Sequence, residues 1–293
     1  MGINIGTATF LTKSDLINST KALSPDKRCK LLMIGRQTMS TRSTDQPGLA
    51  KYNPRVRASS LEINTYAEDF LTDLGATIIE SLDYSDFESA EIIHNLNQSF
   101  EGSKIEHLKN SFDLVLDYGT SEHVFQAAQS ISNSISLVRV GGRLNMVLPV
   151  CGYLEHGFYQ FSPNFFRALE GKYLRLIQMY IYEPYTGTIQ IWNAKNLPDV
   201  PFFERLDGRY LCWTVYEKIS EFDENDFLLN TQQGVYKRAW ENTRKDLAKE
   251  RESMSAFSKF KNNAVKNYYF LQRYFMYSKK ITKDQIEKIL ISE

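Results

Sequence analysis

Short apolar runs that end in a glycine or an acid alternate with helical segments along most of this chain. CKLLMIG (29–35), TIIESLDYSD (77–86) and FDLVLDYGT (112–120) read as strands, whereas SLEINTYAEDFLTDLGA (60–76) and SEHVFQAAQSISNSISLV (121–138) carry apolar residues at helical spacing. Alternation of this kind predicts right-handed crossovers between parallel strands. We therefore expect an α/β fold, with a mainly parallel sheet covered by helices on both faces.

Two further runs follow late in the sequence and close together. YLRLIQMYIYEP (173–184) and RYLCWTVYEKI (209–219) are rich in the aromatic and β-branched residues that favour strands. They predict a late antiparallel pair of strands at the end of the sheet.

Charge divides the chain unevenly. From residue 236 to the end, 14 Lys and Arg stand against 7 Asp and Glu, although the whole chain holds 35 of each kind. We predict an N-terminal extension (1–27), a sheet domain (28–222) and a basic, aromatic-rich helical C-terminal region (223–293). That last region is expected to pack as amphipathic helices on its own domain or on a second copy of the chain, as a homo-oligomer.

Patterns of cysteine, histidine and hydropathy exclude several classes of protein. The three cysteines are widely spaced and unpaired by any motif, and the four histidines show no metal-binding spacing, so we predict no metal. No apolar run approaches the ~20 residues of a membrane span, and the N-terminus lacks a secretory pattern. We expect a cytoplasmic protein.

The segment FDLVLDYGTSEHVF (112–125) places an acid, a glycine and a Glu-His pair at the carboxyl end of a predicted strand. A carboxylate that closes a buried strand must be paired or must face a cleft, which favours Asp117 as a site residue. Adjacent residues of a helix point about 100° apart. Only one of Glu122 and His123 is therefore expected to face a small ligand.

This order of elements, with residues 112–125 and the glycine turn and strand of VRVGGRLNMVLPV (138–150), resembles a class I S-adenosylmethionine-dependent methyltransferase over residues 28–220. The resemblance implies a Rossmann-like domain and S-adenosylmethionine as cofactor. One motif departs from the family pattern. In LLMIGRQTMS (31–40), Met33 replaces the usual acid and Gly35 is the one glycine left, with Arg36 and Gln37 as substitutes for its polar contacts.

The resemblance also implies that the cofactor lies at the carboxyl ends of the strands. Asp83 falls where the family has an acid that accepts hydrogen bonds from the ribose hydroxyls. Asn95 follows the next run, either near the adenine or as an ordinary turn residue. The predicted cofactor-binding residues are Gly35, Asp83, Asn95, Asp117, Gly119 and Glu122.

His156 stands in CGYLEHGFYQFSP (151–163), a stretch dense in aromatic residues. An imidazole with its ordinary pKa of ~6.5 suits general-base catalysis. We predict that His156 takes the proton from an acceptor hydroxyl during methyl transfer. The alternative is a histidine packed in an aromatic loop.

These features predict an S-adenosylmethionine-dependent methyltransferase that acts on the oxygen of a small-molecule or saccharide-like acceptor. One alternative is a methyltransferase-like scaffold that lost its cofactor together with its glycine motif. Another is a nucleic-acid methyltransferase that uses the basic tail, which the neutral overall charge disfavours.

Overall fold

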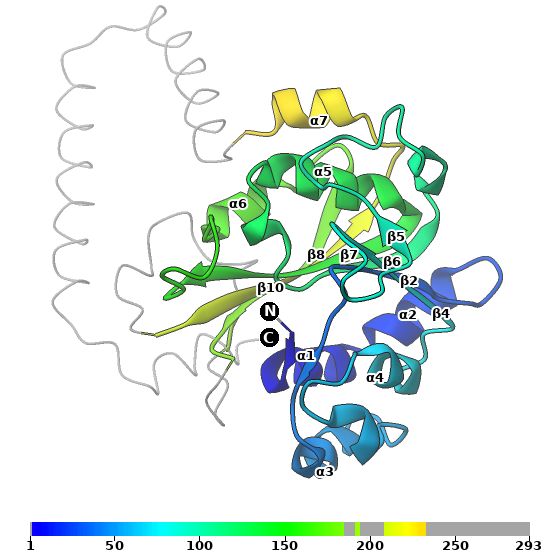
Figure 1. Ribbon diagram of the computed structural model, residues 1–293, viewed down its shortest axis with the longest axis vertical. Coiled ribbons are helices and arrows are strands. Elements are labelled where there is room, and N and C mark those ends of the chain that lie inside the picture. Colours follow the sequence, from blue (N-terminus) through cyan, green and yellow to red (C-terminus); the bar gives the residue numbers. More distant parts are fainter. Residues whose placement is uncertain (1, 185–190, 194–207, 233–293) are drawn as a thin grey trace, which may run out of the picture. The chain divides into compact units, whose positions relative to one another are not determined.

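The structure, a computed structural model, describes residues 2–184, 191–193 and 208–232. An eight-stranded sheet crosses this part of the chain (Figure 1). The order of its strands is β5-β4-β2-β6-β7-β10-β8-β9. The strands are β2 (Lys30–Ile34), β4 (Ile78–Asp83), β5 (Ile92–Ile93), β6 (Phe112–Asp117), β7 (Val138–Cys151), β8 (Leu174–Tyr182), β9 (Ile191–Asn193) and β10 (Tyr210–Lys218).

The five strands from β5 to β7 run parallel to one another. β10 runs antiparallel to both β7 and β8, and β9 runs antiparallel to β8. The predicted α/β fold, with parallel strands first and an antiparallel pair late in the chain, is confirmed.

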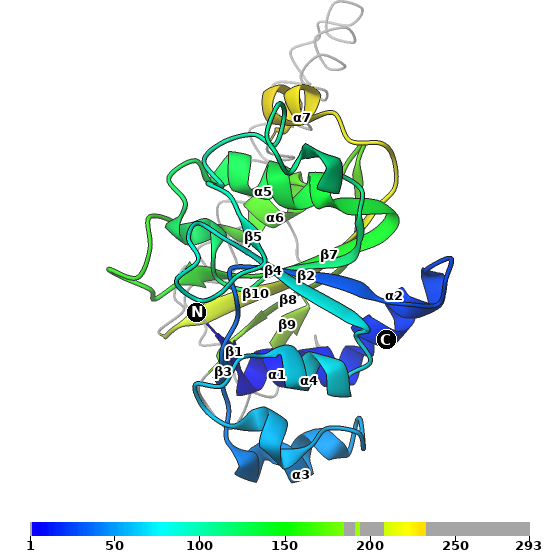
Figure 2. The same ribbon diagram turned by 45° about the vertical axis from the view of Figure 1, so that its right-hand side comes forward.

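Helices cover both faces of this sheet, as the two views in Figures 1 and 2 show. The helices on one face are α1 (Ile5–Ser14), α2 (Leu16–Leu23) and α4 (Glu68–Asp73), with α3 (Gln46–Ala50) beyond them; those on the other are α5 (Ala127–Leu137), α6 (Pro163–Ala168) and α7 (Glu224–Asn230). A short parallel pair, β1 (Ile3–Asn4) and β3 (Met39–Ser40), stands apart from the main sheet. Because both faces are covered, β2 and β6 read as continuous apolar runs, and residues 31–34 and 114–116 are wholly buried.

Two predicted helices are shorter than their sequence patterns indicated. The helix expected from Ser121 begins at Ala127, because residues 121–123 form a separate 3₁₀ turn, η4 (Ser121–His123). In the 60–76 segment only residues 68–73 are α-helical, and a second 3₁₀ turn, η2 (Ala58–Leu61), comes before them. Both predictions were wrong at the N-terminal end of the helix.

One compact unit, Met1–Gln233, contains α1 and α2 together with the sheet. The second unit, Gly234–Glu293, lies outside the described residues, so the helical C-terminal region and its pairing with a second copy stay predictions, as do the domain boundaries. Among the described residues, no helix is both long and apolar enough to cross a membrane.

The strand order reverses at β2. Along the chain, β4 and β5 are added on one side of this strand, and β6 and β7 on the other. Open α/β sheets bind ligands outside the carboxyl ends of their strands at such a switch point. Ile34 is in register with both Leu82 and Asp117, so the ends of β2, β4 and β6 lie side by side.

Candidate active site

Gly35 begins the turn that leaves β2 at the switch point. Its φ of +71° is in the left-handed region, and its N–H donates to the carbonyl of Leu82 at 2.7 Å. A Cβ on this residue would stand 2.5 Å from Oγ1 of Thr120. The Thr120 hydroxyl in turn donates to the carbonyl of Ile34 at 2.6 Å. The side chain of Thr120 therefore lies directly against Gly35.

The two polar residues after Gly35 have different surroundings. Arg36 donates to the Glu68 carboxylate and to the Glu88 carbonyl, each at 2.7 Å, which occupies its guanidinium. Gln37 is buried, and its amide nitrogen donates to the carbonyl of Gly35 at 3.0 Å. Its oxygen, Oε1, has no hydrogen-bond partner among the described residues. One buried acceptor therefore remains beside Gly35.

Asp117 ends β6 wholly buried, and its carboxylate holds the following turn. It accepts hydrogen bonds from the backbone N–H of Thr120 at 3.1 Å and of Ser121 at 3.4 Å, and from the Ser121 hydroxyl. Burial raises its pKa, and these donors oppose the rise. Gly119 passes through this turn at a φ of +90°. A buried carboxylate at the end of a strand must be paired or face a cleft, and Asp117 is paired.

Asp83 and Asn95, the residues predicted for the ribose and adenine side, make different hydrogen bonds within the protein. Asp83 is half-buried at the end of β4, and its Oδ1 accepts from the N–H of Tyr84 at 2.6 Å. Asn95 uses its Oδ1 for the backbone and side-chain nitrogens of Asn97, both at 3.0 Å. These bonds fit the turn alternative for Asn95, and its role toward the cofactor stays a prediction.

Glu122, His123 and His156 come together beside the switch point. Their ligand atoms all lie within 4.8 Å of one another. Oε1 of Glu122 is 3.8 Å from Nε2 of His123 and 3.9 Å from Nε2 of His156. The two imidazole rings meet edge to face, with centroids 4.9 Å apart. Glu122 and His123 lie in a 3₁₀ turn instead of the start of an α-helix, and the expectation that only one of them faces a small ligand stays a prediction.

The loop after β7 holds His156 in this place. The carbonyl of Glu122 accepts from the N–H of Phe158 at 2.8 Å and of Tyr159 at 3.3 Å. A Cβ on Gly157 would stand 3.0 Å from Cγ of Glu122, so the loop packs tightly against that side chain. The backbone of Glu122 therefore anchors the loop that carries His156.

Burial governs the charges of this cluster. Desolvation, and after it the Asp117 carboxylate, raises the pKa of Glu122 to about 8. Burial lowers the pKa of both histidines, and for His123 the charge of His156 lowers it further. All three groups are therefore mainly neutral at pH 7, and they do not form an ion pair. Both carboxyl oxygens of Glu122 lack a hydrogen-bond partner among the described residues.

Exposed apolar side chains border the cluster. Phe125 and Phe158 are 68% and 65% exposed, and their rings meet edge to face at 5.8 Å. We call these exposed side chains, Phe125 and Phe158 with Leu154, the aromatic rim. The Tyr159 hydroxyl donates to the carbonyl of Phe125 at 2.7 Å, which joins the segment after η4 to the loop that carries His156. Leu154 on the same loop is 87% exposed. The rim is suited to a ligand with a flat or apolar face.

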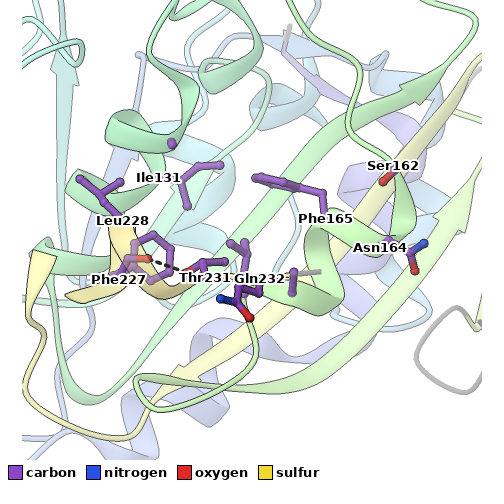
Figure 3. A pocket seen from close by; sticks show the side chains of 11 residues that line it. Ile131, Ser162, Asn164, Phe165, Phe227, Leu228, Thr231 and Gln232 are labelled. Carbon is purple, nitrogen blue, oxygen red and sulfur yellow. Dashed lines mark hydrogen bonds between the residues drawn. The ribbon is translucent and has the colours of Figure 1, made fainter. Parts of the chain in front are cut away.

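A separate cavity of about 410 Å³ lies between α5, α6 and α7, on the face of the sheet and away from the strand ends. Figure 3 shows Phe165, Phe227 and Ile131 around it. None of the predicted site residues lines it. This cavity and the candidate site are therefore different places.

The structure thus brings Gly35, Asp117, Gly119 and Glu122 to one edge of the sheet, with His156 arriving from the loop after β7. Thr120 and its contact with the turn after β2 were not predicted. Nothing in the sequence marks one threonine as the residue that fills a glycine turn 85 positions earlier.

No family model and no curated protein matches this chain. Solved structures do match it. A 1,6-didemethyltoxoflavin-N1-methyltransferase of Burkholderia thailandensis is 10% identical, with a TM-score of 0.36, over 73% of this chain and 83% of that one. A geranyl diphosphate methyltransferase, solved with S-adenosylmethionine, is 9% identical, with a TM-score of 0.39, over 73% and 85%. The [4+2]-cyclase SpnF is 11% identical, with a TM-score of 0.40, over 73% and 82%.

The chain is similar to methyltransferases of known structure.

Proposed function

We propose that this protein is an S-adenosylmethionine-dependent methyltransferase that acts on the oxygen of a small-molecule or saccharide-like acceptor. The observation that supports it is the position of the Glu122–His123–His156 cluster. These residues, two of them histidines, stand beside the carboxyl ends of β2 and β6, where a sheet of this topology binds its ligand.

The residues at this edge fit the cofactor. Asp83 presents a half-buried carboxylate next to the end of β2, as the ribose hydroxyls require. The unpartnered Oε1 of Gln37 is a second acceptor, beside Gly35. Asp117 and Gly119 shape the turn after β6 that closes this edge. When bound, the cofactor supplies a methyl group activated by a sulfonium.

His156 is the residue we propose as the general base. Its side chain is 36% exposed, and burial keeps its pKa below the ordinary value, so the imidazole is neutral and can accept a proton at pH 7. The buried Glu122 lies on one side of it, with Oε1 3.9 Å from Nε2, and the exposed rings of Phe125 and Phe158 offer a surface for the acceptor. An acceptor hydroxyl held against this rim would lose its proton to His156.

Calorimetric titration of the full chain with S-adenosylhomocysteine tests the first half of the proposal. We expect saturable binding that is lost in Asp83→Ala. The Asp86→Ala variant, at an exposed acid three residues further on, is the matched control and should bind as the wild type does. Folded protein that binds neither S-adenosylhomocysteine nor S-adenosylmethionine at millimolar concentration would overturn the enzyme proposal.

One observation favours the second candidate, a methyltransferase-like scaffold without cofactor. The hydroxyl of Thr120 fills the space above Gly35 and bonds directly to the end of β2. A scaffold would retain this closed contact and show no binding in the same titration. The nucleic-acid alternative depends on the basic tail, which lies outside the described residues.

A further inference from the structure

We propose that Glu122, His123 and His156 form a binding site for a divalent transition-metal ion of the Zn²⁺ type. The sequence alone predicts no metal, because its four histidines show no metal-binding spacing. The fold brings the ligands together, because the loop after β7 places His156 against the turn after β6 that carries Glu122 and His123.

The donor set has the chemistry of such a site. Two imidazoles and one carboxylate are a ligand set known for zinc with an open fourth position and for iron(II) with several open positions. Around a tetrahedral ion with bonds of ~2.0–2.2 Å, ligand atoms stand ~3.3–3.6 Å apart. The separations of 3.8 and 3.9 Å between Glu122 and the two histidines are slightly wider, and all three ligand atoms lie within 4.8 Å of one another. Small side-chain movements would close the site on an ion.

The buried carboxyl of Glu122 is the second observation that points to a ligand. Its side chain is wholly buried, and neither oxygen has a hydrogen-bond partner among the described residues. A carboxyl in that position costs free energy unless something pairs with it. The nearest candidates, the two Nε2 atoms, stand beyond hydrogen-bond distance. A cation between the three groups would satisfy all of them.

An ion can reach this position from solvent. The side chains of His123 and His156 are 42% and 36% exposed, while Glu122 forms the closed inner wall. The remaining histidines of the chain, His94 and His107, each contact a backbone carbonyl elsewhere. Because the sequence holds four histidines in all, residues 233–293 contribute no imidazole to a competing site.

This inference goes beyond the proposed function and can be tested without it. A bound ion uses the same Nε2 lone pair with which His156 would accept a proton. The metal-bound form would therefore lack that base. Metal binding is measured on the protein alone, so failure of cofactor binding and failure of metal binding are separate results.

The test is titration of the full, chelator-treated chain with Co²⁺, followed by visible absorption, and with Zn²⁺, followed by calorimetry. We expect one ion per chain and the visible bands of low-symmetry, imidazole-bound Co²⁺. His123→Ala and His156→Ala should each weaken binding by more than the ~10–100-fold that loss of an outer-shell partner costs. Glu122→Gln should weaken it as well, and His107→Ala, the matched control, should not.

Circular dichroism of each variant shows whether it is folded, and His156→Ala is the informative change because His156 lies half-exposed on a loop. The proposal is overturned if folded wild-type protein binds no stoichiometric ion at millimolar Zn²⁺ or Co²⁺. It is equally overturned if the ion binds His156→Ala and His123→Ala as tightly as it binds His107→Ala.

Discussion

The hydroxyl of Thr120 donates to the carbonyl of Ile34 at 2.6 Å and so joins the turn after β6 to the end of β2. This bond crosses the switch point of the sheet, where the strand order reverses. It also places Oγ1 over the one glycine that remains of the first motif, Gly35. The packing of the Gly35 turn against Thr120 is therefore present without any ligand.

A methyl group at Gly35 should destabilise the fold. The left-handed φ costs an L-residue roughly 1–2 kcal/mol, and the 2.5 Å contact with Thr120 adds to it. We expect Gly35→Ala to lower the free energy of unfolding by about 2 kcal/mol or more, measured by urea denaturation. Gly48→Ala, in α3 with nothing within 4 Å of its Cβ position, should be neutral or gain up to ~1 kcal/mol. Equal effects of the two changes would contradict this account.

Removal of the Thr120 hydroxyl should separate stability from cofactor binding. Thr120→Ala loses a half-buried hydrogen bond to Ile34, which costs ~1 kcal/mol, but it clears the space above Gly35. We therefore expect a lower melting temperature together with tighter binding of S-adenosylhomocysteine in calorimetry. Thr65→Ala removes a comparable hydroxyl-to-carbonyl bond at an exposed position and should leave the affinity unchanged. Weaker binding by Thr120→Ala would show that the hydroxyl is a ligand contact.

The parallel half of the sheet was predictable because burial on both faces leaves a direct mark in the sequence. Lys30–Ile34 and Phe112–Asp117 are apolar runs that stop at Gly35 and at Asp117, and the strands end there. The pairing of Asp117 followed from the cost of an unpaired buried carboxylate. Such local rules identify which residues stand at the edge of the sheet.

Contacts between loops that are distant in the sequence could not be predicted from these local rules. The approach of His156 to Glu122 depends on backbone hydrogen bonds from Phe158 and Tyr159 that link two loops more than thirty residues apart. The missing α-helical turn at Glu122 and His123 has a more local cause. Asp117 binds the N–H groups of Thr120 and Ser121, which favours a tight 3₁₀ turn over the α-helix that the apolar spacing predicts.

Two buried acids should respond in opposite ways to replacement of their carboxyl groups. Glu122 has no hydrogen-bond partner among the described residues, so Glu122→Met should raise the free energy of unfolding of chelator-treated protein by ~1–3 kcal/mol. Asp117 accepts from Thr120 and Ser121, so Asp117→Ala should lower it by ~1–3 kcal/mol. Urea denaturation of both variants measures the contrast. Destabilisation of Glu122→Met to the same extent would mean that the glutamate is satisfied in the folded protein.

Lys218 should make stability rise with pH above about 8. It is wholly buried on β10, where Nζ donates to Oδ1 of Asn110 at 2.6 Å and to the carbonyls of Ile135 and Val138. Burial lowers its pKa to about 8, and the nearby Glu221 opposes that shift. The unfolded chain, with a lysine pKa of ~10.4, therefore binds more protons than the folded one between these values.

By linkage, the free energy of unfolding must then increase with pH across that interval, by at most ~1.4 kcal/mol per pH unit for this one group. The difference between wild type and Lys218→Met isolates the contribution. We expect that difference to shift in favour of the wild type between pH 8 and pH 10 and to level off beyond, because the lysine then is neutral in both states. Lys104→Met, at an exposed lysine, controls for the loss of one charge. Parallel curves for wild type and Lys218→Met would mean that the folded protein holds Lys218 charged throughout, stabilised by its three oxygen acceptors.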